Sequence, residues 1–313
     1  MRVAAIDCGT NSIRLLIADI EGTNFREIYR TMEIVRLGQG VDQTKAFHPE
    51  AIARTLAAVD LFAHEIRKRG VQEIRFCATS ATRDATNREI FIDGVKQRLG
   101  IAPEVISGEE EAMLSFIGAT KEFASDQGPF LVVDIGGGST EFVYGHSSVE
   151  FAKSVNIGCV RMTERNIHSD PPKQEEIENA RKDIQEAIAL AASIVPITKA
   201  KTLIAVAGTA TSVAASALGL AQYDRHLIHL ARISAEQAHA VARTFEKMNA
   251  EQRSHVGFLH PGRADVFAAG SLVLSEIMKA TGAKEFVASE SDILDGIACS
   301  LTRKFLGIEN QRS

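Results

Sequence analysis

Two stretches of this sequence share one pattern: VAAIDCGTNSIRLLIAD at residues 3–19 and LVVDIGGGSTEFVYG at residues 131–145. Each consists of an apolar run, an aspartate, a glycine-containing turn with a serine, and a second apolar-rich run. The matching positions are Asp7 and Asp134, Gly9 and Gly136, and Ser12 and Ser139. The pattern predicts the same β-hairpin in both halves of the chain, with an acidic residue ending its first strand.

Both turns are suited to bind phosphate. Glycines let the backbone come close to a ligand, and the N–H groups of a concave turn form an anion nest. The aspartate beside each turn is placed to hold a cation that the phosphate also touches. The alternative is a plain hairpin turn. The turns are not a Walker loop, since no lysine follows the glycines, and they are not a dinucleotide fingerprint. The evidence that they bind phosphate is therefore that the pattern occurs twice.

Strands alternate with helices around the two hairpins, which predicts an α/β protein with two sheets covered by helices. The further strands are expected at 25–37, 73–78, 103–106, 202–206 and 285–288. The helices are expected at 49–69, 80–99, 107–123, 172–195, from 209, at 234–248, 265–280 and 292–306. The polar stretch 124–128 is the predicted linker. It gives domains 1–124 and 125–313, with the final helix packing back on the first domain.

Composition excludes several classes of protein. The 313 residues are 45% apolar and 24% charged, which is ordinary for two globular domains and excludes a disordered chain. The net charge of −5 disfavours non-specific binding to nucleic acid. A polyanionic ligand must therefore be held locally, by a few arginines, backbone N–H groups and a metal. Four scattered cysteines argue against a disulfide framework or a zinc ribbon and indicate a reducing compartment.

No membrane or secretory segment is predicted. The N-terminus reaches Asp7 after four apolar residues, which is not a signal peptide. Residues 202–223 carry no charge and have the length of a membrane span, but small polar residues interrupt them. A buried strand, a glycine turn and a buried helix explain this stretch better. We expect a cytoplasmic protein.

Three carboxylates are candidates for chemistry. Glu141 lies seven residues after Asp134, on the returning strand, so the two form a plausible pair for one hard divalent cation. Ser107 and Glu110 fit a capping box at the start of a helix. This explanation does not account for Glu111. Its carboxylate either interacts favourably with the helix dipole or serves as a general base at a rigid helix start.

Two other motifs combine hydroxyl groups with a helix start. ATSATRDATN at 78–87 carries Arg83 and would suit an anion, but taken alone this motif favours a capped helix with a solvated arginine. VAGTAT at 206–211 enters a helix through Gly208, which suits either phosphate or close packing.

Together, these motifs resemble the exopolyphosphatase/guanosine pentaphosphate phosphohydrolase family of the actin/Hsp70/sugar-kinase superfamily. The resemblance covers nearly the whole chain and rests on AAIDCGTNSIRLLIAD, ATSATRDATN, ISGEEEA, VVDIGGGSTEFVYG, VAGTATSVAA, GRADVFAAG and SESDILDGI. It implies two actin-like (ribonuclease-H-like) α/β domains with the active site in the cleft between them.

The resemblance also implies roles for individual residues. Glu111 corresponds to the catalytic glutamate, and Asp134 and Glu141 to the metal carboxylates. The phosphate loops fall on Gly9–Ser12 and Gly136–Thr140, and the phosphate-gripping arginines on Arg14, Arg83 and Arg263. The full set of expected phosphate or substrate contacts is Asp7, Gly9, Thr10, Asn11, Ser12, Arg14, Arg83, Gly136, Gly137, Gly138, Ser139, Thr140, Gly208, Thr209 and Arg263.

The implied reaction is release of terminal orthophosphate from inorganic polyphosphate, with guanosine pentaphosphate as the alternative substrate. Mg²⁺, or another divalent cation such as Mn²⁺, would neutralise the terminal oxygens while Glu111 deprotonates water. We expect a homodimer that binds no nucleic acid and no membrane. A small-molecule kinase of the same fold and a non-catalytic sensor of phosphate chains are the competing functions.

The sequence departs from the family in two places. Where the family has G-L-R-E-G, residues 293–296 read ILDG, and Asp295 is taken to replace a basic residue. Longer members also carry a helical C-terminal region that is missing here, so the preferred length of polyphosphate is left open.

Overall fold

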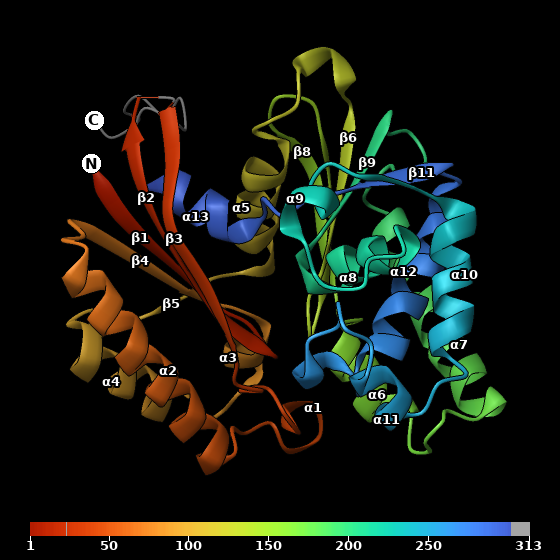
Figure 1. The fold of residues 1–313 in the computed structure, drawn as a ribbon, viewed down its shortest axis with the longest axis horizontal. Helices are drawn as coiled ribbons and strands as arrows, with labels where there is room; N and C mark the ends of the chain where they lie inside the picture. Colours follow the sequence, from red (N-terminus) through yellow and green to blue (C-terminus); the bar gives the residue numbers. More distant parts are fainter. Residues whose placement is uncertain (23, 302–313) are drawn as a thin grey trace. The chain divides into compact units, whose positions relative to one another are not determined.

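The computed structural model describes residues 1–22 and 24–301. By its internal contacts the chain divides into two compact units (Figure 1). Unit 1 consists of Met1–Gly118 and the chain from Ile293 onward, and unit 2 of Ala119–Asp292. The division after Gly118 lies close to the predicted domain boundary at residue 124. Each unit contains one mixed sheet with helices packed on it, so the predicted α/β class is confirmed.

The sheet of unit 1 is built on the first predicted hairpin. Its strand order is β3-β2-β1-β4-β5. Strand β2 is antiparallel to both of its neighbours, β1 and β3, and β4 is parallel to β1. The strands are β1 (Arg2–Cys8), β2 (Ser12–Glu21), β3 (Asn24–Ile34), β4 (Glu73–Ala78) and β5 (Glu104–Val105). In the hairpin register Asp7 lies directly opposite Arg14.

Helices cover both faces of this sheet. They are α1 (Val41–Thr44), α2 (Pro49–Lys68), α3 (Ser80–Asp84), α4 (Arg88–Leu99), α5 (Gly108–Thr120) and α13 (Ile293–Ser300). Successive residues of β1 point to opposite faces, and both sets are buried. Ile6 belongs to a core with Phe62 of α2, whereas Ala5 belongs to a core with Leu114 of α5 and Ile297 of α13. Burial on both faces explains the uninterrupted apolar run of β1.

Unit 2 repeats the plan with a six-stranded sheet of order β10-β11-β9-β6-β7-β8. The strands are β6 (Phe130–Ile135), β7 (Thr140–Gly145), β8 (Val149–Val155), β9 (Thr202–Val206), β10 (Arg232–Ser234) and β11 (Glu285–Ala288). The second predicted hairpin is β6–β7, and its register places Asp134 directly opposite Glu141. Strand β9 runs parallel to β6, and β11 runs parallel to β9.

Seven α-helices of unit 2 are described: α6 (Cys159–Asn166), α7 (Gln174–Ala192), α8 (Ala207–Ala217), α9 (Arg225–Ile228), α10 (Ala235–Phe245), α11 (Ala250–Ser254) and α12 (Phe267–Thr281). Two 3₁₀ turns lie at Ser125–Gln127, inside the predicted linker, and at Pro261–Arg263. Helix α12 is buried over almost its whole length and packs against α10, α6 and α7. The core of unit 2 therefore surrounds α12.

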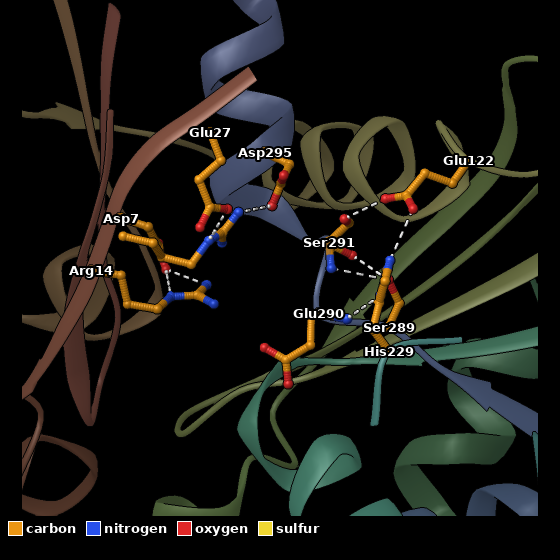
Figure 2. Close-up of polar contacts among 10 residues, drawn as sticks. Asp7, Arg14, Glu27, Glu122, His229, Ser289, Glu290, Ser291 and Asp295 are labelled. Carbon is orange, nitrogen blue, oxygen red and sulfur yellow. Dashed lines mark hydrogen bonds and ion pairs between the residues drawn. The ribbon is translucent and has the colours of Figure 1, made fainter. Parts of the chain in front are cut away.

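Hydrogen bonds tie the beginning of unit 2 to its end. Glu122 accepts from Ser291 Oγ at 2.8 Å and lies 2.9 Å from His229 Nε2 (Figure 2). Because His229 Nδ1 accepts from the backbone N–H of Glu290, Nε2 carries the ring hydrogen and donates it to Glu122. The bond from His229, followed by the bond from Ser291, lowers the pKa of Glu122 to about 2.

The predicted secondary structure agrees best where the apolar pattern is strong. Strands 73–78, 202–206 and 285–288 begin and end at the predicted residues. Helix α13 ends at Ser300, and residues 302–306 of the predicted final helix lie outside the described residues. Strand β8 and the short α1, α6, α9, α11 and β10 were missed. They are short or half-exposed, so they carry little periodic signal.

The uncharged stretch from residue 202 forms β9 and the buried helix α8, as expected. The helix begins at Ala207, directly after β9, so Gly208 lies in its first turn and not in a separate turn before residue 209. Among residues 1–22 and 24–301, no helix combines the length and apolar character needed to cross a membrane. The four cysteines are free and buried.

Helix α13 is seated on α5 through Gly296. A Cβ atom at this position would lie 2.0 Å from the backbone oxygen of Leu114. We expect Gly296→Ala to lower the free energy of unfolding by about 2 kcal/mol, because backbone must move to accept the methyl group. Gly94→Ala is the control, since there the Cβ meets the movable end of Leu56 and alanine favours the helix. Urea denaturation measures both, and equal stabilities would contradict this packing.

Candidate functional site

The turn of the first hairpin, loop 1 (Gly9–Ser12), is braced by the segment that follows β3. Its own turn is closed by the N–H of Gly9 donating to Ser12 O at 3.0 Å. The N–H groups of Val35 and Arg36 both donate to Asn11 O, at 3.0 and 2.9 Å, and Gly38 N–H donates to Thr10 O at 2.8 Å. The carbonyl groups of loop 1 are thus bonded on the side of this brace.

The turn of the second hairpin, loop 2 (Gly136–Thr140), is braced in the same way by the start of α6. The N–H of Gly136 donates to Ser139 O at 3.0 Å, as in loop 1. Cys159 N–H donates to Gly136 O at 3.0 Å, and Val160 N–H to Gly137 O at 2.9 Å. A turn whose carbonyls are bonded on one side presents its N–H groups on the other, which is the geometry of an anion nest.

Sequence reasoning found both loops but not their braces. Gly38 and Gly158 are the signal that was available, because each brace approaches its loop too closely for a side chain. A Cβ at Gly38 would lie 2.4 Å from Thr10 Cγ2, and one at Gly158 would lie 2.2 Å from the carbonyl carbon of Gly137. Arg161 was also missed: its buried guanidinium donates through Nε to Gly138 O at 2.7 Å.

One buried hydroxyl group of loop 1 lacks a hydrogen-bond partner among the described residues. Thr10 is 7% exposed, and its buried Oγ1 has no hydrogen-bond partner among the described residues. A buried hydroxyl without a partner costs free energy that a bound oxygen ligand would recover. This observation supports the predicted role of loop 1 in binding an anion.

The two hairpins differ in the residue opposite the aspartate. In unit 1, Arg14 donates to Asp7 Oδ2 through Nε at 3.0 Å and Nη2 at 2.6 Å (Figure 2). In unit 2, the equivalent position holds Glu141, which accepts from Ser154 Oγ at 2.7 Å. Unit 1 therefore places a cation beside its loop, whereas unit 2 places a second carboxylate there.

Glu111 lies in the first turn of α5 and is 8% exposed. Its Oε2 accepts from Arg83 Nη1 at 2.7 Å, and the same nitrogen donates to Ile106 O at 3.0 Å. Burial raises the pKa of the Glu111 carboxyl, the charge of Arg83 opposes that rise, and the negative charge of Asp7 adds to it. A buried carboxylate whose pKa is raised in this way is suited to act as a general base.

Glu110 has a different environment. The predicted capping contact exists, since Ser107 Oγ accepts from the N–H of Glu110 at 3.2 Å. The side chain of Glu110 does not complete the box, because its carboxylate pairs with Arg75. The structure thus separates the neighbouring glutamates, with Glu110 in a salt bridge and Glu111 beside loop 1.

Gly208 and Arg263 are brought together in unit 2. The guanidinium of Arg263 lies over Gly208, where a Cβ atom would come within 1.2 Å of Arg263 Nη1. Thr209 hydrogen bonds to the thiol of Cys159, whose backbone N–H braces loop 2. Gly208, Thr209 and Arg263 therefore lie beside loop 2, as a shared phosphate site requires. Close packing and phosphate binding, the two explanations left open for Gly208, are compatible.

Asp295 has a structural partner. It is 1% exposed and accepts from Arg30 Nη2 at 2.9 Å, while Arg30 Nε donates to Glu27 at 2.9 Å (Figure 2). Gly296 must be a glycine because of Leu114, which makes it the anchor of the motif. Counted back from Gly296, Asp295 occupies the glutamate position of G-L-R-E-G and Leu294 the arginine position. The assignment of a basic residue to position 295 was therefore wrong.

Asp134 and Glu141 are suited to a divalent cation. Both are almost fully buried, and cross-strand pairing brings their Cβ atoms to about 5 Å. Among the described residues, no group of three or more His, Cys, Asp or Glu side chains could hold a metal ion. Two carboxylates suffice for Mg²⁺, which keeps several waters and takes further oxygens from substrate phosphates.

Comparison with known proteins identifies the family. The model of the Ppx/GppA phosphatase family matches residues 16–305. This chain belongs to the Ppx/GppA phosphatase family. The Mycobacterium tuberculosis protein named Exopolyphosphatase 2 is 45% identical, over 96% of this chain and 98% of its own length. A Vibrio atlanticus protein named guanosine-5'-triphosphate,3'-diphosphate pyrophosphatase is 36% identical over 52% of this chain and 33% of its own length.

Solved structures of Ppx/GppA proteins share the fold. The crystal structure of an exopolyphosphatase-like protein has a TM-score of 0.93 and 44% identity, covering 97% of this chain and 98% of that chain. The Aquifex aeolicus member of the Ppx/GppA family has a TM-score of 0.79 and 28% identity, covering 96% and 97%. The predicted two-domain actin-like architecture is confirmed by these relatives.

Each unit thus assembles its own group of the predicted site residues. Unit 1 brings together loop 1 with Asp7, Arg14, Arg83 and Glu111. Unit 2 brings together loop 2 with Asp134, Glu141, Gly208, Thr209 and Arg263. The catalytic, metal and phosphate roles of these residues stay predictions.

The environments of the two glutamates predict different kinetics. Glu111→Gln keeps the shape and the bond from Arg83 but cannot take a proton, so kcat on tripolyphosphate should fall ~10²–10⁴-fold with KM little changed. Glu110→Gln, the matched control, loses only a half-exposed salt bridge and should stay within about threefold of wild type. Equal losses in the two variants would show that Glu111 is not the base.

The pKa of Glu111 predicts a pH dependence. A base must be deprotonated, so the raised pKa places the acid limb of the kcat–pH profile above the ordinary range of a glutamate. Arg83→Gln removes the cation that lowers this pKa, and the limb should move to higher pH by about one unit or more. Arg88→Gln, which changes a more exposed arginine, should leave the profile in place. A limb that moves to lower pH with Arg83→Gln would contradict the pairing.

Proposed function

We propose that this protein is an exopolyphosphatase that releases terminal orthophosphate from inorganic polyphosphate by attack of water. The observation that carries the proposal is the 45% identity to Exopolyphosphatase 2 over almost the whole of both chains. The carboxylates expected from the family are also present: Glu111, Asp134 and Glu141 are buried beside the two loops.

The residues of unit 1 would prepare the attack. Glu111 orients a water molecule and takes its proton, and Arg83 holds the Glu111 carboxylate at a fixed position. Arg14 presents a planar guanidinium beside loop 1, where it can bind two phosphoryl oxygens while Asp7 orients it. Phosphoryl transfer needs little covalent chemistry from a protein, so positioning and neutralisation of charge account for most of the catalysis.

The residues of unit 2 would hold the leaving phosphate chain. The N–H groups of loop 2 and the guanidinium of Arg263 provide positive charge beside Gly208 and Thr209. Asp134 and Glu141 are the residues that would hold Mg²⁺, or Mn²⁺ in its place. When bound, such an ion supplies neutralisation of the charge on the phosphoryl oxygens.

Guanosine pentaphosphate is the second candidate substrate. Relatives named guanosine-5'-triphosphate,3'-diphosphate pyrophosphatases match about half of this chain, and this substrate also presents terminal phosphoryl groups. A kinase of the same fold would transfer phosphate to an acceptor, and a pure sensor would have no use for the buried base Glu111. We also propose a cytoplasmic location, consistent with four free cysteines, and a homodimer.

Release of phosphate from polyphosphates of graded length and from guanosine pentaphosphate, with no acceptor present, tests the proposal. We expect release from polyphosphate to depend on Mg²⁺. Asp134→Ala and Glu141→Ala should each raise the Mg²⁺ concentration needed for half-maximal rate at least tenfold, or abolish turnover, with the fold intact by circular dichroism. The exposed Glu178→Ala is the control. Full wild-type activity in excess chelator would contradict the metal-assisted mechanism, and a requirement for an acceptor would indicate a kinase.

A further inference from the structure

Arg263 is carried by a segment with little regular structure of its own. Between α10 and α12 the chain forms only the short helix α11 and the 3₁₀ turn Pro261–Arg263. We call residues 248–264 the strap. A side chain on such a segment is placed accurately only if other contacts hold the segment, because loops otherwise have many conformations.

One buried side chain holds both ends of the strap. The side chain of Arg253, in α11, is 4% exposed. Its Nε donates to Ala264 O at 2.6 Å, and Nη1 donates to Met248 O. Ala264 is the residue directly after Arg263, so the bond from Arg253 fixes the backbone on which Arg263 is carried.

Asp170 anchors Arg253 to the body of unit 2. Arg253 Nη2 lies 3.4 Å from Asp170 Oδ1, and the same carboxylate accepts from the N–H of Ala250 at 2.8 Å. Three acceptors in three directions match the planar fork of an arginine. A lysine at this position could keep the charge but could not reach all three acceptors in the same geometry.

Two further contacts seat the strap. A Cβ at Gly257 would lie 2.3 Å from Ala221 O, so the strap lies against the chain that follows α8. At its far end, the guanidinium of Arg263 lies over Gly208, at the start of α8. The strap is therefore docked on both ends of α8, and Arg253 sets its shape between these points.

We infer that Arg253 is a positioning residue for substrate binding and that it acts through Arg263. The inference rests on the proposed function, in which Arg263 binds the phosphate chain. Arg253 itself is buried and bonded to the protein, so it does not contact the substrate. Its removal should weaken binding without changing the groups that attack or activate water.

A double-mutant cycle tests this inference. Arg253→Met, Arg263→Ala and the double variant are compared by steady-state kinetics and by calorimetric Kd for tripolyphosphate. We expect Arg253→Met to raise KM and Kd about tenfold with kcat within about twofold, and to add less than about twofold in the Arg263→Ala background. Arg253→Lys should recover part of the affinity. The control is Arg243→Met, an exposed arginine of α10, with both constants unchanged.

A loss of folding is distinguished from a loss of positioning. Each variant is measured below its own melting temperature, and Gly257→Ala provides a second way to displace the strap without touching Arg253. Gly257→Ala should also raise Kd and also lose its effect when Arg263 is alanine. Additive effects of Arg253→Met and Arg263→Ala, or an Arg263→Ala variant with unchanged Kd, would overturn the inference. If tripolyphosphate binds but is not hydrolysed, the proposed function fails while the binding cycle still decides the role of Arg253.

Discussion

The geometry of the predicted site depends on hydrogen bonds that the carbonyl oxygens of the two glycine loops accept from neighbouring segments. In loop 1 the segment from Val35 to Gly38 supplies the N–H donors, and in loop 2 the start of α6 supplies them. A peptide group has its N–H and C=O pointing in nearly opposite directions, so bonding the carbonyls on one side aims the N–H groups at the other. The segments that brace the loops, rather than the glycines alone, therefore give each turn the shape expected of an anion nest.

The same hairpin occurs twice with opposite charge at one position. Asp7 faces Arg14 across its hairpin, and Asp134 faces Glu141. In unit 1 the arginine neutralises the aspartate and leaves a guanidinium beside the loop. In unit 2 two buried carboxylates face each other across the hairpin. Such a pair is stable only with neutralising partners such as protons, hydrogen-bond donors or a cation. The two hairpins therefore differ in charge at one matching position, which holds an arginine in unit 1 and a glutamate in unit 2.

Two opposing effects act on the pKa of Glu111, the predicted base. Burial favours the neutral carboxyl, while Arg83 favours the carboxylate and also fixes its direction. Arg83 also donates to Ile106 O, directly after β5, so the contact that holds Glu111 is itself held by the chain at the end of this strand. The strap places Arg263 by an equivalent use of a buried arginine bonded to backbone carbonyls. In both units, an arginine bonded to a backbone carbonyl group helps to hold a residue that is proposed to act on the substrate.

The sequence by itself determined the features that are local or repeated: the two hairpins, the alternation of strands and helices, and Asp134 opposite Glu141, because a seven-residue spacing across a tight turn leaves little choice of register. Resemblance of motifs led to the family and to Glu111. Only the tertiary structure decided which neighbours these residues have. Arg83 bonds to Glu111, Glu110 bonds to Arg75, and Asp295 bonds to Arg30, in pairs that lie far apart along the chain. The braces and the strap were likewise decided only by the tertiary structure. Their long-range hydrogen bonds depend on how the whole chain packs, and they leave no periodic pattern in the residues that make them.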